Sequence, residues 1–340
     1  MKAMKRVSFV LCFFLLTFSF FISYGFCQTK PIELNYSIFY PATHKMAVLA
    51  TEWSKEVEKR TNGGVKITMF YGGTLTPADK CYEGVVNGIA DIGWSVFGYS
   101  RGRFPLTEIA DMPLGAKNSP VPTRLANEYY KKFRPKELDD VKVIYLICTG
   151  PSILHTIKPV TKLEDLKGMK IRSGGLTAKV VAALGAAPVA MPIGEAYDAL
   201  SKGVAEGTIL PMEAMEGWRL GEVVKYSIEN YGSAPPGGQY VVMNKDKWNA
   251  MSPDVQKIVE KINEEWIEKT GRAFDEIDKS GRDYVQKLGN KIIPLSKEED
   301  QRWTRAVRPI LDQYVKDVKA KGLPGDEVLR FWLDYIGKNR

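Results

Sequence analysis

The segment LEDLKGMKIR, residues 163–172, is the most informative stretch of this 340-residue sequence. It forms the end of a short apolar strand and delivers Arg172 directly before Ser173, Gly174 and Gly175. A guanidinium group is always charged, and its fork of donors matches both oxygens of a carboxylate. The two glycines allow a ligand to approach the backbone closely. The segment therefore predicts a carboxylate site; the alternative is a solvated arginine at the end of a surface strand.

The N-terminus has the pattern of a secretory signal peptide over residues 1–27. Basic residues precede an apolar run at 7–22, and small residues follow it. This run is shorter than the roughly 20 residues that cross a bilayer, so we expect cleavage rather than an uncleaved anchor. Lipid attachment at Cys27 is a further alternative, but the bulky Phe26 before it does not suit a lipoprotein signal.

Composition argues against a disulfide scaffold and against a nucleic-acid partner. After the predicted signal peptide the chain contains only Cys81 and Cys148. A single bridge could form in an oxidising compartment, but Cys148 ends an apolar run, where a buried free thiol is the commoner outcome. The net charge of +8 is spread out, with no block of like charges. A chain of this length is expected to form two lobes.

Strands and helices alternate in two runs, which predicts an α/β protein with largely parallel sheets. The first run comprises strands at 32–38, 65–70 and 89–94, with helices at 44–60 and 77–87. The second comprises strands at 141–148, up to 172, at 188–191 and within 203–210, with helices at 176–184 and 194–201. An amphipathic stretch without internal proline at 253–287 predicts one long helix that can brace two lobes.

The sequence contains no familiar catalytic or metal-binding motif. Its two histidines, His44 and His155, belong to no cluster with metal-ligand spacing. Phosphate-binding loops, nucleophile elbows and zinc-protease helices are also missing. His44 is expected to cap or pack at the start of the first helix. We therefore expect a non-enzymatic protein without cofactor or metal; the competing interpretation is a secreted enzyme that acts on small carboxylates.

Seven segments, taken in their order and spacing, carry a resemblance to a known family. They are YPATH at 40–44, FYGGTL at 70–75, VNGIADIG at 86–93, the segment 163–172, LGAAPVAMP at 184–192, EAYDAL at 195–200 and GVAEG at 203–207. Together they resemble the substrate-binding subunits of tripartite ATP-independent periplasmic (TRAP) transporters, the DctP-like proteins. The resemblance covers essentially the whole chain after the predicted signal peptide.

The resemblance implies two α/β lobes, a long hinge helix and a ligand cleft between the lobes. Lobe I is expected to comprise residues 31–149 and 237–276, and lobe II residues 150–236 and 277–340. Such a protein resides in the periplasm, captures an organic acid and delivers it to the small and large integral-membrane subunits of the transporter. A protein of the same fold that feeds a sensor instead is the other alternative.

Arg172 matches the carboxylate-binding arginine of this family, but two other positions depart from the family pattern. Many relatives carry a second arginine where this chain has Gly150, Pro151 and Ser152. They carry asparagine before a proline where this chain has Leu210. The contacts that relatives make with sialic acid or dicarboxylates are therefore not expected here.

The resemblance also implies which other residues line the cleft. They are Phe39, Trp94, Val96, Ser152, Gly174, Ile193, Leu210, Pro211, Met212, Glu213 and Gln239, with Gly238 as an alternative to the last. One arginine in a mostly apolar lining suits a monocarboxylate with an apolar or aromatic body, because a second buried carboxylate would lack a partner.

Three of these assignments have alternatives. Trp94, Ile193 and Leu210 could instead pack the lobe cores. Glu213 could contact a ligand hydroxyl or amine, or it could stabilise the start of a helix through the helix dipole. Trp218 is a weaker lining candidate, because a tryptophan in such a segment more often belongs to the core.

Overall fold

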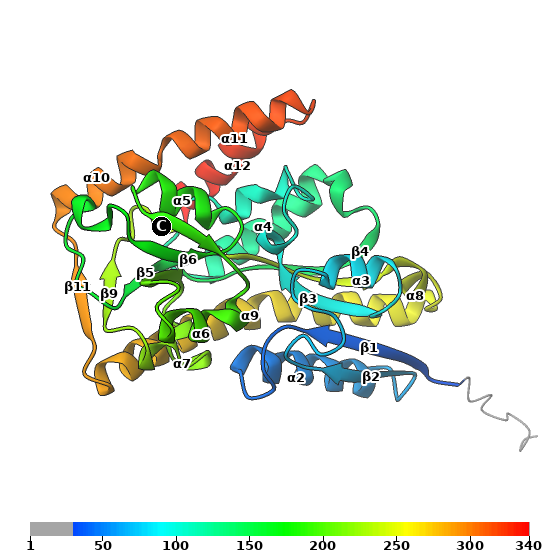
Figure 1. The fold of residues 1–340 in the computed structure, drawn as a ribbon. Coiled ribbons are helices and arrows are strands. Elements are labelled where there is room, and N and C mark those ends of the chain that lie inside the picture. Colours follow the sequence, from blue (N-terminus) through cyan, green and yellow to red (C-terminus); the bar gives the residue numbers. More distant parts are fainter. Residues whose placement is uncertain (1–29, 340) are drawn as a thin grey trace, which may run out of the picture.

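The strands form two sheets, both of which lie along one long helix (Figure 1). The structure is a computed structural model and describes residues 30–339. The first sheet has the order β2 (Val65–Phe70), β1 (Ile32–Ile38), β3 (Ile92–Val96), β10 (Gly238–Asn244) and β4 (Val141–Cys148). The second has the order β11 (Lys291–Pro294), β9 (Tyr226–Glu229), β5 (Ile153–Thr156), β8 (Gly207–Leu210), β6 (Lys170–Ser173) and β7 (Ala187–Ala190).

The chain passes between the sheets three times, twice through short links and once through the long helix α9 (Pro253–Lys287), which leads to β11 of the second sheet. We call residues 30–148 and 238–252 the first unit and residues 153–229 the second unit. The segment 149–152 leads from β4 to β5, and the segment 230–237 leads from β9 back to β10.

Each sheet is largely parallel, as predicted, but contains one antiparallel strand that the sequence did not predict. In the first sheet β10 runs antiparallel to β3 and β4, which share one direction with β1 and β2. In the second sheet β5 alone opposes the others. The reason is the route of the chain: β5 and β10 each enter from a linking segment and therefore start where their neighbours end. All other strands direct their carboxyl ends toward the links, which is where ligands bind in α/β sheets.

The long helix α9 (Pro253–Lys287) confirms the predicted range and contacts both units. Ser252 caps its start by accepting a hydrogen bond from the Val255 amide at 3.4 Å, and Pro253 occupies the first turn. The helix packs on α2 (Lys45–Arg60) and α4 (Pro120–Phe133) of the first unit and on α7 (Ala214–Gly217) of the second.

The remaining helices cover the two sheets. The first unit also contains α3 (Cys81–Val86) and α8 (Lys245–Asn249), the second contains α5 (Thr177–Ala183) and α6 (Ala196–Ser201), and the C-terminus forms α10 (Lys297–Val307), α11 (Pro309–Ala320) and α12 (Gly325–Lys338). The predicted helix at 77–87 is shorter than expected, and the one at 194–201 begins with a 3-10 turn, Ile193–Glu195.

The C-terminal helices contact both units. α10 packs on α5 of the second unit, whereas α12 packs on α4 of the first (Figure 1). The lobe ranges derived from the resemblance therefore stay a prediction. The assignment of the C-terminal segment to lobe II alone is the least certain part, because its helices contact both units.

Three further predictions from the sequence concern the cysteines, membrane-spanning helices and the N-terminus. Cys81 and Cys148 are both free and buried, so no disulfide joins them. Within residues 30–339 we find no helix with the length and apolar character needed to cross a membrane. The predicted signal peptide, residues 1–27, lies outside the described residues.

Close packing of α9 against the second unit yields a test of the fold. A Cβ atom at Gly281 would lie 2.2 Å from the carbonyl oxygen of Met212. Alanine favours a helix by about 1 kcal/mol over glycine, but overpacking against a backbone atom costs about 1–3 kcal/mol or more. We expect Gly281→Ala to lower the melting temperature measured by circular dichroism.

The control for this variant is Gly337→Ala in α12. No atom lies within 4 Å of a Cβ built at Gly337, so the propensity gain should stand alone and the variant should be as stable as the parent or more stable. Equal melting temperatures for the two variants would contradict the close contact of α9 with the second unit.

Candidate ligand-binding site

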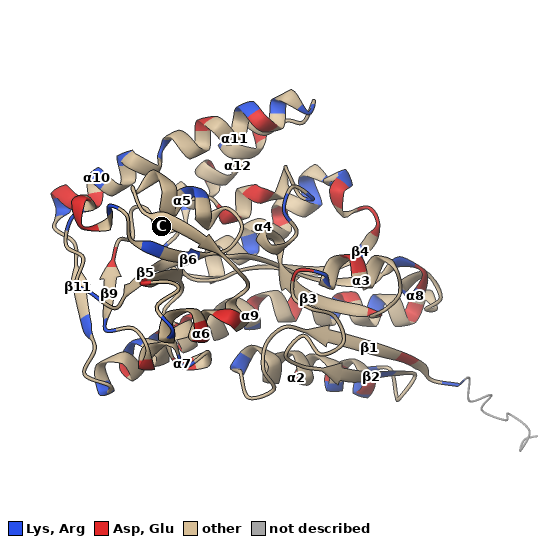
Figure 2. Cartoon of the chain, viewed as in Figure 1, with Lys and Arg blue, Asp and Glu red and all other residues tan. Residues whose placement is uncertain are grey.

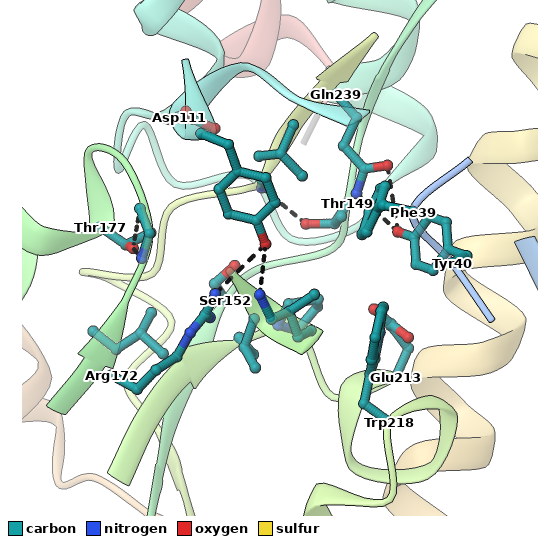
Figure 3. Close-up of a pocket in the computed structure, with 18 residues that line it drawn as sticks. Phe39, Tyr40, Asp111, Thr149, Ser152, Arg172, Thr177, Glu213, Trp218 and Gln239 are labelled. Atoms are coloured by element: carbon teal, nitrogen blue, oxygen red, sulfur yellow. Dashed lines mark hydrogen bonds between the residues drawn. The ribbon is translucent and has the colours of Figure 1, made fainter. Parts of the chain in front are cut away.

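A pocket lies between the two units and receives residues from both (Figure 3). It contains about 570 Å³ of space not filled by protein atoms, part of it open to solvent. Ten of the residues predicted from the sequence line it: Phe39, Val96, Ser152, Arg172, Gly174, Ile193, Leu210, Pro211, Glu213 and Gln239. Their convergence places the pocket at the carboxyl ends of the strands, beside the linking segments.

Arg172 is the dominant polar group of the pocket. It lies on β6, and only 2% of its surface is exposed. Its Nε and Nη2 donate to the carbonyl oxygen of Met191 at 3.2 and 2.7 Å, and Nη2 lies 3.5 Å from the Tyr99 hydroxyl. No acidic side chain of residues 30–339 pairs with it, and Nη1 has no protein partner there. A buried charge without a counter-ion is costly, so the site favours a ligand anion.

The glycines after Arg172 leave room for residues of the first unit to pack closely against the turn. Gly175 has φ +53°, and a Cβ atom on it would lie 2.4 Å from the Cα of Gly98. A Cβ on Gly174 would lie 3.0 Å from the ring of Tyr99. The hydroxyl of Tyr99 also accepts a hydrogen bond from the Ile193 amide at 3.1 Å. The Gly-rich turn that the sequence singles out therefore forms a contact between the two units.

Aromatic rings form the apolar part of the lining. Phe39 stacks with Trp218 at a centroid distance of 6.1 Å and meets the edge of Tyr99 at 6.3 Å. Tyr40 packs on Phe39 at 4.1 Å. Phe39 and Tyr40 follow β1, whereas Trp218 follows α7, so the stack also spans the two units.

Two predicted lining residues, Trp94 and Met212, do not face the pocket. The Trp94 side chain is fully buried and donates from Nε1 to Oε1 of Gln239 at 2.7 Å. Gln239 in turn donates from Nε2 to the Tyr40 hydroxyl at 2.9 Å. Trp94 thus fixes the orientation of a lining residue from behind. Met212 lies against α9 instead.

Seven lining residues were not predicted from the sequence. They are Tyr40, Tyr99, Asp111, Thr149, Thr177, Ile209 and Gly237, and the weaker candidate Trp218 also lines the pocket. Tyr99 and Thr149 come shortly after the carboxyl ends of β3 and β4. The rule that ligands bind beyond the carboxyl ends of strands could have found them. Asp111 ends a 3-10 helix, Thr107–Asp111, and follows no strand, so that rule does not reach it.

Two acidic side chains belong to the pocket. Burial raises the pKa of Asp111 to about 7, although a 2.5 Å hydrogen bond from the Gly238 amide lowers it. Glu213 is buried and bonds through Oε2 to Nε2 of His44 at 2.9 Å. Because Glu213 belongs to the second unit and His44 to the first, this bond crosses between them.

The two histidines have structural roles. His44 caps α2, as expected, because its Nδ1 accepts a hydrogen bond from the Met46 amide at 3.2 Å. Its Nε2–H is then available to donate to Glu213. Burial lowers the pKa of His155 to about 4, so the ring is neutral and its Nε2 donates to the carbonyl of Leu210 at 3.1 Å. In the described part of the chain we find no group of three or more metal-ligating side chains.

The sequence matches the model of the family described as bacterial extracellular solute-binding protein, family 7 (DctP), over residues 36–317. The chain belongs to this family. Its members include the substrate-binding subunits of TRAP transporters, and the two-lobed α/β fold with a long helix agrees with the prediction.

Three solved TRAP solute-binding proteins illustrate the similarity. The protein of Desulfovibrio salexigens, solved as an open complex, is 32% identical, with 90% of this chain and 96% of that chain covered and a TM-score of 0.80. The protein of Rhodoferax ferrireducens, with copurified benzoate, is 27% identical, with coverages of 90% and 98% and a TM-score of 0.85. The protein of Bordetella bronchiseptica, with bound mandelate, is 27% identical, with coverages of 91% and 100% and a TM-score of 0.85.

A buried carboxyl group beside the pocket yields a pH prediction. Asp278 of α9 accepts a hydrogen bond from the Glu213 amide at 2.8 Å, and burial raises its pKa to about 8. Between about pH 4 and pH 8 the folded chain holds this proton and the unfolded chain does not, so stability falls as pH rises. We expect Asp278→Asn to gain stability relative to the parent between about pH 5 and pH 8.5.

Thermal unfolding at both pH values measures this gain. Asp283→Asn, at an exposed position on the same helix, is the matched control and should show no pH-dependent difference from the parent. If the difference between Asp278→Asn and the parent does not grow with pH, the buried protonated carboxyl group is excluded.

Proposed function

We propose that this chain is a periplasmic solute-binding protein that captures an aromatic or similarly apolar monocarboxylate and delivers it to TRAP membrane subunits for uptake. The observation that carries the proposal is the buried Arg172, which has no acidic partner among the described residues and faces a pocket with aromatic walls. A ligand carboxylate would neutralise the guanidinium, and the rings would cover the ligand body.

The polarity of the pocket supports one carboxylate rather than two. Arg172 is the only cationic side chain in the lining, which also contains the acidic Asp111 and Glu213. By the resemblance to the family, Ser152 and Leu210 take the places of further polar partners. A second carboxylate would therefore be buried without a counter-ion. Benzoate and mandelate, found in two similar proteins, are both aromatic monocarboxylates.

The contacts between the units support capture by closure. Gly98 meets Gly175, Tyr99 accepts from Ile193, and His44 bonds to Glu213. The two links at 149–152 and 230–237, together with α9, form the natural hinge, and one similar protein is known in an open form. A ligand that touches both units would shift the population toward the closed form. The proposal assigns no chemical step to the pocket, so the acid should be recovered unchanged.

Binding titrations with benzoate and succinate test the ligand class. Burying a phenyl ring contributes about 25 cal/mol per Å² of apolar surface removed from water, while the second carboxylate of succinate would lack a partner. We expect benzoate to displace a bound probe at lower concentration than succinate in a competition assay. A clear preference for succinate would overturn the aromatic monocarboxylate assignment and leave the family unaffected.

Replacing Arg172 by lysine tests the carboxylate anchor. An ammonium group keeps the charge but cannot make the planar two-point contact, and each lost charge-assisted bond costs about 1.5–3 kcal/mol. Calorimetry with benzoate should show at least about a tenfold loss of affinity. Arg305→Lys, at an exposed position on α10, is the control and should bind as the parent does. Unchanged affinity in a folded Arg172→Lys variant would exclude the anchor role.

A further inference from the structure

We propose that Glu213 and Trp218 form a hydroxyl-binding subsite, so that the preferred ligands of this chain are aromatic monocarboxylates with a hydroxyl group on the ring. The inference rests on the proposed function and makes it more specific. It concerns the end of the pocket away from Arg172 (Figure 3).

The chain of contacts along the pocket places this subsite away from the carboxylate anchor. The Tyr99 hydroxyl lies 3.5 Å from Arg172 Nη2, and the Tyr99 ring meets the edge of Phe39. Phe39 then stacks on Trp218 with an angle of 14° between the ring planes. A ligand whose carboxylate binds Arg172 therefore lies along Phe39 with the far edge of its ring toward Trp218 and Glu213.

Two polar atoms at this end lack protein partners among the described residues, and one of them, the Nε1 of Trp218, is buried. Glu213 is only 3% exposed, and His44 occupies its Oε2, but Oε1 has no partner within residues 30–339. The Nε1 of Trp218 is buried and also has no partner in the described structure. The buried indole N–H is unfavourable without an acceptor, and the free Oε1 of a carboxyl group that lines the pocket is available to accept from a ligand.

A hydroxyl group has the chemistry to serve both atoms. It carries one donor hydrogen for the Glu213 carboxyl oxygen and lone pairs for the indole N–H of Trp218. An ammonium group could only donate, and a second carboxylate could only accept. A methoxy group keeps the oxygen but removes the donor, so it would leave Glu213 without a partner.

The acceptor is held in a fixed place before a ligand binds. Asp278 of α9 accepts from the Glu213 amide at 2.8 Å, and His44 holds the Glu213 side chain from the other unit at 2.9 Å. Because these bonds already order the carboxyl group, little conformational entropy is lost when it accepts a ligand hydrogen. This arrangement distinguishes Glu213 from a carboxylate that merely stabilises the start of α7.

Calorimetric titrations with benzoate, 3-hydroxybenzoate, 4-hydroxybenzoate and 3-methoxybenzoate test the inference. For the parent chain we expect at least one hydroxybenzoate to bind about tenfold more tightly than benzoate, as one charge-assisted hydrogen bond allows. The methoxy compound should lose this advantage. The comparison among ligands needs no variant, so it holds even if a substitution harms folding.

Two variants test whether Glu213 and Trp218 cause the preference for a hydroxybenzoate. In Glu213→Gln and in Trp218→Phe the affinity ratio of the preferred hydroxybenzoate to benzoate should fall from about tenfold to less than about threefold. Glu216→Gln is the matched control, since Glu216 lies on the same helix α7 but is exposed and bonds to Ser280. It should keep the ratio of the parent.

The outcomes separate this inference from the proposed function. If none of the four aromatic acids binds, the proposed function fails and the subsite fails with it. If benzoate binds but neither hydroxybenzoate binds more tightly, only the subsite is overturned. A ratio that persists in both Glu213→Gln and Trp218→Phe would also overturn the subsite and leave the aromatic monocarboxylate function intact.

Discussion

The buried guanidinium group of Arg172 is the constraint on which the rest of the site depends. It lies on a short strand with 2% of its surface exposed, held by the carbonyl of Met191 and approached by the Tyr99 hydroxyl. Neither group carries a negative charge, so the positive charge remains uncompensated until an anion arrives. The aromatic walls reduce access of water and thereby strengthen the attraction between guanidinium and carboxylate. Selectivity for an acid thus follows from the burial of one charge without a partner inside the chain.

The direction of the strands explains why residues far apart in the sequence meet here. Every strand except β5 and β10 directs its carboxyl end toward the gap between the units, and those two start there. The segments that follow β1, β3 and β6 therefore supply Phe39, Tyr99 and Gly174 to one pocket. Charged residues are distributed over the helices outside it, without concentration on one element (Figure 2).

How much of the fold and the pocket could be predicted from the sequence depends on the sequence pattern that each element requires. The helix α9 was predictable to the residue because its apolar periodicity, its Ser252 cap and its initial proline agree. Trp94 was misplaced because it shares a face of β3 with the lining residue Val96. It lies two residues further from the carboxyl end, so Gln239 separates it from the pocket. The antiparallel direction of β5 and β10 follows from crossing between units, which alternation of strands and helices does not reveal.

The loop Pro211–Glu213 contacts both the long helix and the first unit. α9 holds it from one side, through the Asp278 carboxyl group and the close contact at Gly281. His44 of the first unit holds it from the other side through Glu213. A displacement of the first unit would break that bond, and the same displacement would separate Tyr99 from Ile193. Residues of both units line the pocket, so under the proposed function a ligand that contacts both units also favours closure. A ligand shifts the balance between open and closed forms only by the difference between its affinities for the two forms. Under the proposed function, a ligand that binds the closed form more tightly therefore also closes the units to a greater extent.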